Sequence, residues 1–312
     1  LVGGSVVNTG RLEAPAGEIG LVAVGGNSTV KLATPGSLLS MEVEAETAAL
    51  APGLNHESAI AATDLPELLT GAAVESEAQS LIVNADGSVI LRGRAIDEGT
   101  AAVAGEVSVA APSGAGGTAV IVGESVAVID AAIEASGDRG GTIRIGGDLR
   151  GEGTLPTANE TFIDATSIIH ADGEPTAGGN IVAWANNNIT VQGTISAQGI
   201  NEGGFVETSA AYVDISEAQV TAGGKTTAGT WLVDPIDIEI VGGLAAGINQ
   251  ISDSTIEISI NANTNFEVTT SGAGVDDGDL TLSTDIIPNA SGTGNLILTS
   301  RRFENCCGHL IN

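Results

Sequence analysis

A short phrase of the form Gly-x-[Val/Ile]-x-[Val/Ile/Ala] recurs along this chain. Within each copy, apolar and polar residues alternate, which is the two-residue period of a β-strand, and glycines separate the copies. The copies read GSVV from Gly4, GSVI from Gly87, GEVSV from Gly105, GTAVIV from Gly117, GTIRI from Gly141, GNIVA from Gly179 and GFVET from Gly204. A second phrase ending in Ala-x-Gly follows several of them, as in GTISAQG at Gly193–Gly199. The chain is therefore expected to build many similar short-strand units.

The spacing of the glycines predicts how these units are arranged. Gly141 and Gly179 are 38 residues apart, Gly179 and Gly204 are 25 apart, and Gly204 and Gly224 are 20 apart. We interpret this as a repeat of about 20 residues with insertions in some copies, which is typical of a β-solenoid. One such turn cannot bury its own apolar face, so successive turns must stack. Val, Ile, Leu and Ala are expected to point inward, and polar residues outward.

The alternative fold is an ordinary β-sandwich, which is also rich in short alternating strands. Hydrophobic residues make up 42% of the 312 residues, so either fold has enough apolar material for a core. Aromatic residues make up only 2%, and sandwich cores usually contain several large aromatic side chains. The sequence therefore favours the solenoid.

The pattern divides the chain into four parts. Residues 1–43 and 81–300 are predicted to form solenoid coils, and residues 44–80 an excursion of loop and short helix. This excursion is rich in Ala and Glu, and its DLPELLTG stretch has a capping residue, Asp64, and a terminating glycine, Gly71. Residues 301–312 lose the alternation, contain the adjacent Cys306 and Cys307, and are expected to be an irregular tail.

Charge and cysteine content exclude several classes of function. The chain has 39 acidic and 10 basic residues, a formal net charge of −29. Nucleic-acid binding requires a basic surface, so we expect no nucleic-acid partner, and an anionic membrane surface would also repel the chain. Adjacent cysteines cannot form a disulfide framework.

Few residues indicate site chemistry. The three histidines, His56, His170 and His309, lack metal-ligand spacing, and His170 is expected to be a solvated corner residue. Asp276, Asp277 and Asp279 share one turn, which makes them weak candidates for calcium ligands, with a solvated acidic turn as the default. The stretch Asp148–Glu160 is the most polar turn beside a strand and a candidate binding edge. We predict no catalytic residue and no cofactor.

Residues 140–240 resemble one family in detail. The order is GGTIRIGGD, then HADG, then GGNIVAW, then GGFVE, then TWLVDP. This order is similar to that of the filamentous haemagglutinin-type exoproteins of two-partner secretion, and most similar to the branch with the high-molecular-weight adhesins and their cyanobacterial relatives. The residues that carry the match, all expected to be structural, are Gly178, Gly179, Trp184, Gly203, Gly204, Trp231, Asp234 and Pro235.

The resemblance implies a right-handed parallel β-helix, secretion through an outer-membrane barrel partner, and attachment at the surface of a Gram-negative bacterium, with cyanobacteria among the sources. The family's secretion domain carries an Asn-Pro motif that this sequence lacks, so we expect a fragment without that domain.

The expected function is therefore a non-catalytic rod segment of a secreted adhesin, with an unknown cell-surface or glycan ligand. Two alternatives remain open. One is a β-helix enzyme acting on polysaccharides, in which Asp148 or Glu152 would be essential. The other is a module that binds haem or a host protein, with the excursion as its first candidate site.

Overall fold

The computed structural model describes residues 1–25, 97–245, 247–270, 278–289, 292–306 and 308–311 in full. It also describes the backbone of five strands that lie between residues 29 and 95. The predicted short helix at Asp64–Gly71 lies outside the described residues, as do Asp276 and Asp277.

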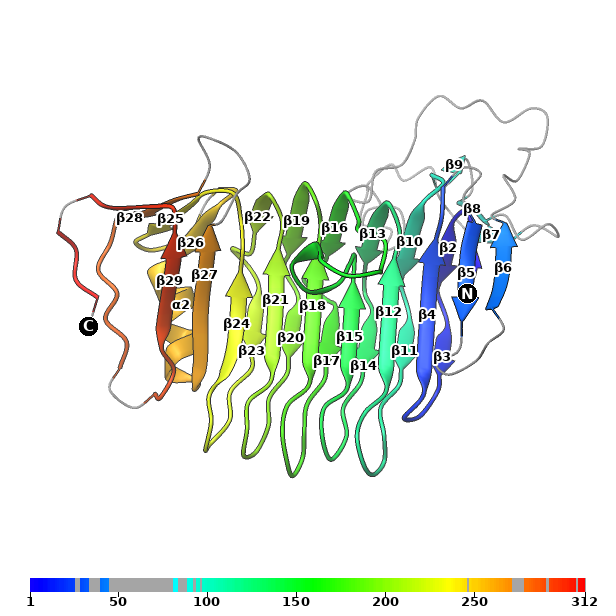
Figure 1. The fold of residues 1–312 in the computed structure, drawn as a ribbon, viewed down its shortest axis with the longest axis horizontal. Coiled ribbons are helices and arrows are strands. Elements are labelled where there is room, and N and C mark those ends of the chain that lie inside the picture. The colour runs from blue at the N-terminus through cyan, green and yellow to red at the C-terminus, as the bar shows by residue number, and fades with distance from the viewer. Residues whose placement is uncertain are drawn as a thin grey trace.

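Three parallel sheets run side by side along the long axis of the molecule (Figure 1). Sheet A consists of β1 (Val2–Gly3), β4 (Glu18–Ala23), β12 (Thr118–Val122), β15 (Thr142–Ile145), β18 (Asn180–Trp184), β21 (Phe205–Ser209), β24 (Gly229–Val233), β27 (Thr264–Thr270) and β29 (Leu296–Ser300). Sheet B consists of β2 (Val6–Asn8), β10 (Thr100–Val103), β13 (Ser125–Val128), β16 (Glu160–Ile163), β19 (Asn188–Val191) and β22 (Tyr212–Asp214). Sheet C consists of β3 (Arg11–Glu13), β11 (Glu106–Ser108), β14 (Ala132–Glu134), β17 (Ile168–His170), β20 (Thr194–Ser196) and β23 (Gln219–Thr221).

The chain visits the sheets in the fixed order A, B, C and then returns to A one position further along. It rises along sheet A at the front of Figure 1, descends through sheets B and C behind it, and advances toward the C-terminal end. The winding is therefore right-handed, the usual hand for parallel crossovers. The fold is a β-solenoid, as the repeated phrase predicted, and more specifically the right-handed parallel β-helix that the resemblance implied. The parallel ladders exclude the β-sandwich.

Measured along sheet A, an uninterrupted coil contains 24 or 25 residues. Thr118 pairs with Thr142, Asn180 with Phe205, and Phe205 with Thr230. The predicted period of about 20 is therefore wrong. It came from taking Gly224 as the next anchor, whereas the ladder places Gly229 opposite Gly204, because Phe205 and Thr230 are partners.

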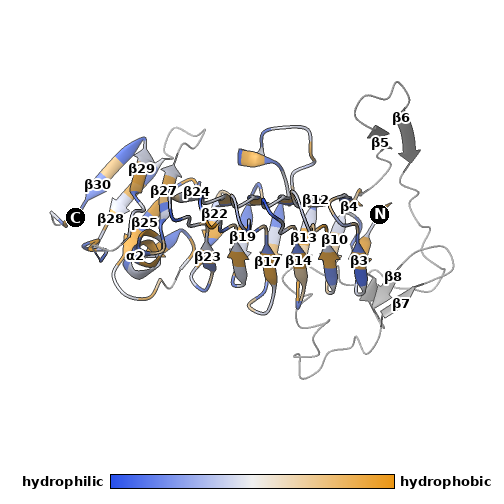
Figure 2. Cartoon of the chain, turned by 90° about the horizontal axis from the view of Figure 1, so that it is seen from below, coloured by the Kyte–Doolittle hydropathy of each residue, from blue (hydrophilic) through white to orange (hydrophobic). Residues whose placement is uncertain are grey.

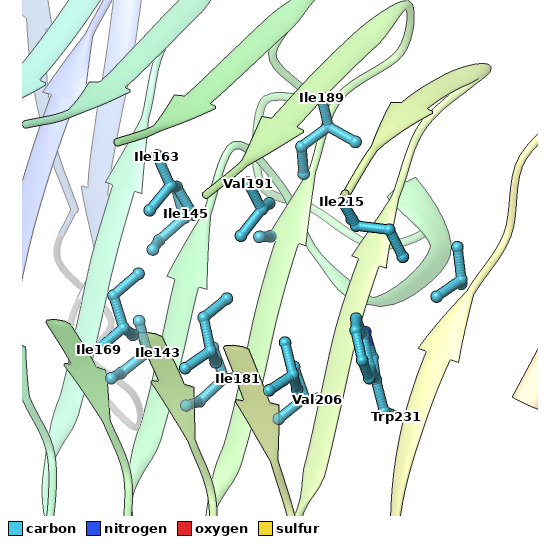
Figure 3. Close-up of a cluster of buried hydrophobic side chains, with 14 of the residues drawn as sticks. Ile143, Ile145, Ile163, Ile169, Ile181, Ile189, Val191, Val206, Ile215 and Trp231 are labelled. Carbon is cyan, nitrogen blue, oxygen red and sulfur yellow. The ribbon is translucent and has the colours of Figure 1, made fainter. Parts of the chain in front are cut away.

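Inward-facing aliphatic side chains stack in ladders inside the coils (Figure 3). Along sheet A, the ladder contains Ile143, Ile181 and Val206, each of which is completely buried. Partner residues on adjacent parallel strands lie about 4.8 Å apart, so each side chain packs directly on its counterpart. This stacking explains why one coil cannot fold alone and why the phrase is repeated.

The coil is longer toward the C-terminal end, where Thr230 and its partner Asn265 are 35 residues apart. There the same ladder continues into Trp231 and Phe266, which are also buried. Sheet C ends at β23, and helix α2 (Asp253–Asn261) lies in the place that a sheet C strand takes in earlier coils. The Ser252 hydroxyl caps this helix by accepting the Thr255 N–H at 3.0 Å.

A fourth parallel sheet lies at the C-terminal end of the stack. Its strands are β26 (Gln250–Ser252), β25 (Ile238–Val241), β28 (Asp279–Leu282) and β30 (Arg302–Asn305). Because β30 pairs with β28 over four residues, part of the segment predicted as an irregular tail is a regular strand of the stack. The sequence RFEN does not indicate a strand, because all four of its side chains are exposed and apolar and polar residues do not alternate in it.

The excursion interrupts the stack over a longer range than predicted. The parallel ladder leaves the stack after β4 and returns at β10. In between, β5 (Thr29–Ala33) pairs antiparallel with β6 (Ser40–Glu44), and β7 (Leu81–Val83), β8 (Val89–Leu91) and β9 (Arg94–Ala95) form an antiparallel sheet. The boundaries at 43 and 81 are therefore too narrow, because alternation alone does not distinguish a hairpin strand from a coil strand.

In the part of the chain that the structure describes, no helix has the length and apolar character needed to cross a bilayer.

Candidate functional site

One coil carries a loop that folds back over the outside of the stack. The loop comprises residues 146–159, between β15 and β16, and we call it the strap. It lengthens the step from Thr142 to its partner Asn180 to 38 residues. Figure 1 shows it in green in front of sheet A, and Figure 2 shows it arching away from the stack on the same side. It contains most of the polar turn Asp148–Glu160 that the sequence indicated as a binding edge.

The strap covers a row of outward-facing residues on sheet A. The register aligns Arg144, Val182, Glu207, Leu232 and Glu267 on five successive strands. Residues on the outer face of a solenoid are usually solvated, but Val182, Glu207 and Leu232 are at most 1% exposed. A glutamate in this position is unusual, because an ionised carboxylate is almost never fully buried without a partner.

The side chain of Trp184 packs against the backbone of the strap, on the side that faces sheet A. Trp184 is the last residue of β18 and its ring points outward beneath the strap backbone. A Cβ atom on Gly151 would lie 2.6 Å from the indole ring, and Gly151 has a positive φ of 64°. Only glycine fits at this position, since a side chain would collide with the ring and strain the backbone. Among the described residues, the buried indole Nε1 has no hydrogen-bond partner.

Polar contacts close the two ends of the strap. The N–H of Ala158 donates to the carbonyl of Gly146 at 2.7 Å, which joins the start and the end of the loop. Inside the loop, the carboxylate of Asp148 accepts the N–H groups of Thr154 and Leu155, each at 3.3 Å. Asp148 also lies 3.5 Å from the guanidinium of Arg144 on β15. The strap is thus a defined structure attached to sheet A.

Glu207 is the chemically distinctive residue of the site. Its carboxylate oxygens lie 3.0 and 3.2 Å from the backbone N–H of Arg150, which comes from the strap. Burial raises the pKa of Glu207 to about 7, and the nearby Asp234 adds to the increase. The hydrogen bonds from Arg150 and Ser209 oppose the shift in pKa, but burial is the larger cause.

The strap arginine itself points to a different carboxylate. The guanidinium of Arg150 lies 3.7 Å from Glu267 on β27. The strap therefore contacts three strands of sheet A: β18 through Trp184, β21 through Glu207 and β27 through Glu267. In the sheet, β24 lies between the last two. Such an arrangement can exclude water, hold a proton on Glu207 and respond to pH.

The predicted structural glycines lie at the corner that leads into sheet A. Gly178 and Gly179 occupy it in one coil, and Gly203 and Gly204 in the next. A Cβ on any of them would overlap backbone atoms of an adjacent coil. Together with neighbouring corners, these glycines line a shallow open groove of about 480 Å³. The groove exists because these corners lack side chains.

The other motif residues have separate positions. The Nε1 of Trp231 donates to Thr208 at 2.9 Å inside the core. Asp234 follows β24, and its N–H donates to the hydroxyl of Ser209 at 3.1 Å. Pro235 is buried in the turn before β25. The two tryptophans therefore have opposite environments, with Trp231 inside the coils and Trp184 outside beneath the strap.

The calcium candidates stay a prediction. Asp279 is described, and its carboxylate pairs with Arg302 on the adjacent strand, while its two partners in the motif lie outside the described residues. Within the described ranges, no group of three or more Asp, Glu, His or Cys side chains is arranged to hold a metal ion. Calorimetric titration with calcium would test the prediction, and no heat at millimolar calcium would contradict it.

His170 differs from its predicted role as a solvated corner residue. It ends β17, and its Nδ1 lies 3.0 Å from the carboxylate of Glu134, its direct register partner on β14. The hydrogen bond to Glu134 raises the pKa of His170, although burial opposes this. The sequence missed this pair because Glu134 and His170 are 36 residues apart and meet only through the coil register.

Comparison with known proteins found no matching family model and no matching curated protein.

Proposed function

We propose that this chain is a non-catalytic rod segment of a secreted bacterial adhesin of the filamentous haemagglutinin type. The observation that carries the proposal is the unbroken parallel ladder of sheet A, which extends through nine strands. At about 4.8 Å per strand, these strands span roughly 38 Å. A stack of this kind is stiff along its axis and holds a binding region away from the surface that bears it.

Two further features support this role. The motif order in residues 140–240 resembles that family, and the motif glycines and Trp231 occupy positions where packing requires them. The net charge of −29 also keeps an elongated protein soluble and prevents rods from associating side by side. In this proposal the ligand is a cell-surface molecule or glycan, and export uses an outer-membrane barrel that recognises a separate secretion domain.

An attachment assay tests the proposal. Beads coated with the 312-residue chain should adhere to host cells or to immobilised glycans more than beads coated with an acidic protein of similar charge. A variant with a disrupted stack, Gly179→Ala, should lose this adhesion. Absence of adhesion to every cell type and glycan, with a folded chain on the beads, would contradict the attachment role while leaving the fold intact.

A polysaccharide-active enzyme is the second candidate, and one observation favours it. A carboxyl group with a pKa near 7 is suited to donate a proton to a leaving sugar oxygen. Against this role, Glu207 is completely buried, and Asp148, one of the residues expected to be essential, is engaged by the strap backbone. Release of reducing sugars from acidic polysaccharides, abolished by Glu207→Gln or Glu152→Gln, would support the enzyme and contradict the adhesin.

The third possibility, a module for haem or a host protein, depends on the excursion, most of which lies outside the described residues. A change in the absorption spectrum or melting temperature when haem is added would test it.

A further inference from the structure

The strap and Glu207 form a device that neither the adhesin role nor the resemblance requires. We propose that the strap, residues 146–159, is a pH-operated cover on the outer face of sheet A, held closed while Glu207 is neutral and released when Glu207 ionises. This inference does not depend on the proposed function.

The first step is the geometry of closure. Glu207 is 0% exposed although its side chain points away from the coil interior, so the water that would solvate it has been displaced. In its place, the strap offers the backbone N–H of Arg150. A hydrated carboxylate accepts several hydrogen bonds, so one shared donor and the Ser209 hydroxyl compensate only part of the loss.

The second step is the charge around Glu207. Arg150 on the strap and Arg144 on β15 supply positive charge, but each guanidinium lies closest to another carboxylate, Glu267 and Asp148 respectively. Asp234, after β24, faces Glu207 and repels its ionised form. The two arginines thus already face three carboxylates, and ionisation of Glu207 adds a fourth negative charge to the site. The neutral form is the one that the closed site accommodates.

The third step is the direction of the pH effect. In the closed state, the pKa of Glu207 is about 7, against an ordinary value of 4.5. When the strap opens, water returns and the pKa falls toward the ordinary value. Closure therefore takes up a proton between these two pH values. The closed state is fully favoured below about pH 4.5, weakens as the pH rises through 7, and changes no further at higher pH.

The size of the effect follows from the same two values. A difference of about 2.5 pKa units corresponds to a change of up to roughly 300-fold in the ratio of closed to open strap. Opening exposes the ring of Trp184 together with Val182 and Leu232. This is an apolar strip on the outside of the rod, and it becomes available in neutral or alkaline medium.

Hydrogen–deuterium exchange of the full chain tests the proposal. Amides of strap residues 150–155 should lose protection by tens-fold or more between pH 5 and pH 8.5, after correction for the intrinsic exchange rate. Amides of β15, β18 and β21 report on the intact stack and should remain protected. Equal strap protection at both pH values would overturn the proposal.

Three variants locate the effect. Glu207→Gln cannot ionise and should keep the strap protected at both pH values. Glu267→Gln is the matched control, since it removes a neighbouring carboxylate that contacts Arg150 but is partly exposed. It should lower strap protection equally at both pH values and keep the pH dependence. Gly151→Ala should open the strap at all pH values, because its Cβ collides with Trp184.

The same variants define the results that would contradict the proposal. If Glu207→Gln keeps the full pH dependence of the wild-type strap, another group is responsible and the proposal fails. If Glu207→Gln does not fold, as judged by lost protection of β18, the comparison of wild type with Gly151→Ala decides. If protection of the strap amides changes with pH to the same extent in wild type and in Gly151→Ala, the proposal of a pH-operated cover is rejected.

Discussion

Trp231 and Phe266 are direct partners on adjacent strands and meet edge to face inside the solenoid, with ring centroids 4.8 Å apart and an angle of 70° between the rings. Aromatic pairs prefer this geometry because the positive edge of one ring faces the negative face of the other. The pair lies in the part of the stack where α2 takes the place of sheet C. Both side chains are larger than the aliphatic residues at the same ladder position in earlier coils, and both are buried.

Replacing Trp231 should therefore destabilise the chain strongly. We expect Trp231→Ala to lower the free energy of unfolding by about 3–5 kcal/mol, through lost burial and a cavity beside Phe266. Trp184→Ala is the control, because it removes an outward-facing tryptophan and should disturb mainly the strap. Urea denaturation followed by circular dichroism would measure both. An equal decrease in the free energy of unfolding in the two variants would show that the interior tryptophan contributes no more to stability than the outward-facing one.

Gly179, at a corner, and Gly20, on a strand, form a second matched pair, which tests how closely adjacent coils pack. A Cβ at Gly179 would overlap the carbonyl oxygen of Gly141 in the preceding coil, whereas at Gly20 on β4 it would meet no atom within 4 Å. Gly179→Ala should lower the free energy of unfolding by more than about 1 kcal/mol, and Gly20→Ala should be neutral or slightly stabilising. Thermal melts of the two variants would distinguish them. A Gly179→Ala variant as stable as wild type would contradict the close packing of coils.

The His170–Glu134 pair predicts a pH-dependent contribution to stability. Because the hydrogen bond to Glu134 raises the pKa of His170 above its ordinary value of 6.5, the folded state binds this proton more tightly than the unfolded chain. The contribution is fully present below pH 6.5 and is lost as the pH rises through the raised value. Titration of the His170 ring by NMR should show the higher pKa. In Glu134→Gln the pKa should fall, and an unchanged value would argue against the pair.

Glu207 predicts the same direction of pH dependence for global stability. The folded state favours the neutral carboxyl, so wild type should lose stability as the pH rises from about 4.5 to about 7. Glu207→Gln should match wild type at pH 4.5 and exceed it at pH 8.5, by at most about 3 kcal/mol. Denaturation midpoints at the two pH values would measure this. A variant less stable than wild type at pH 8.5 would show that ionised Glu207 contributes favourably.

Much of the architecture was predictable because it depends on local repetition. Four of the seven copies of the phrase that begins with glycine, at Gly117, Gly141, Gly179 and Gly204, became strands of sheet A. The phrase that ends in Ala-x-Gly became the strands of sheet C, as at Gly193–Gly199. Alternation of period two is set by strand geometry alone, so it could be found without knowing any long-range contact.

The candidate site was predictable only in part. The polar composition of Asp148–Glu160 pointed to the strap, but nothing in GGFVETS distinguished Glu207 from an ordinary solvated residue on an outer face. The decisive contact joins Glu207 to the backbone of Arg150, which is 57 residues away in the chain. The orientation of the tryptophans follows from register. Trp231 aligns with Val206 and points inward, whereas Trp184 aligns with Ser209 and points outward.

The sequence by itself determined that this chain winds into a stack of short parallel strands, because a repeated amphipathic phrase can bury its apolar face only against a copy of itself. Only the tertiary structure decided the length of a coil, the limits of the excursion and the burial of Glu207. These depend on which coil each residue meets, and that choice is made by packing between segments distant in sequence rather than by any local pattern.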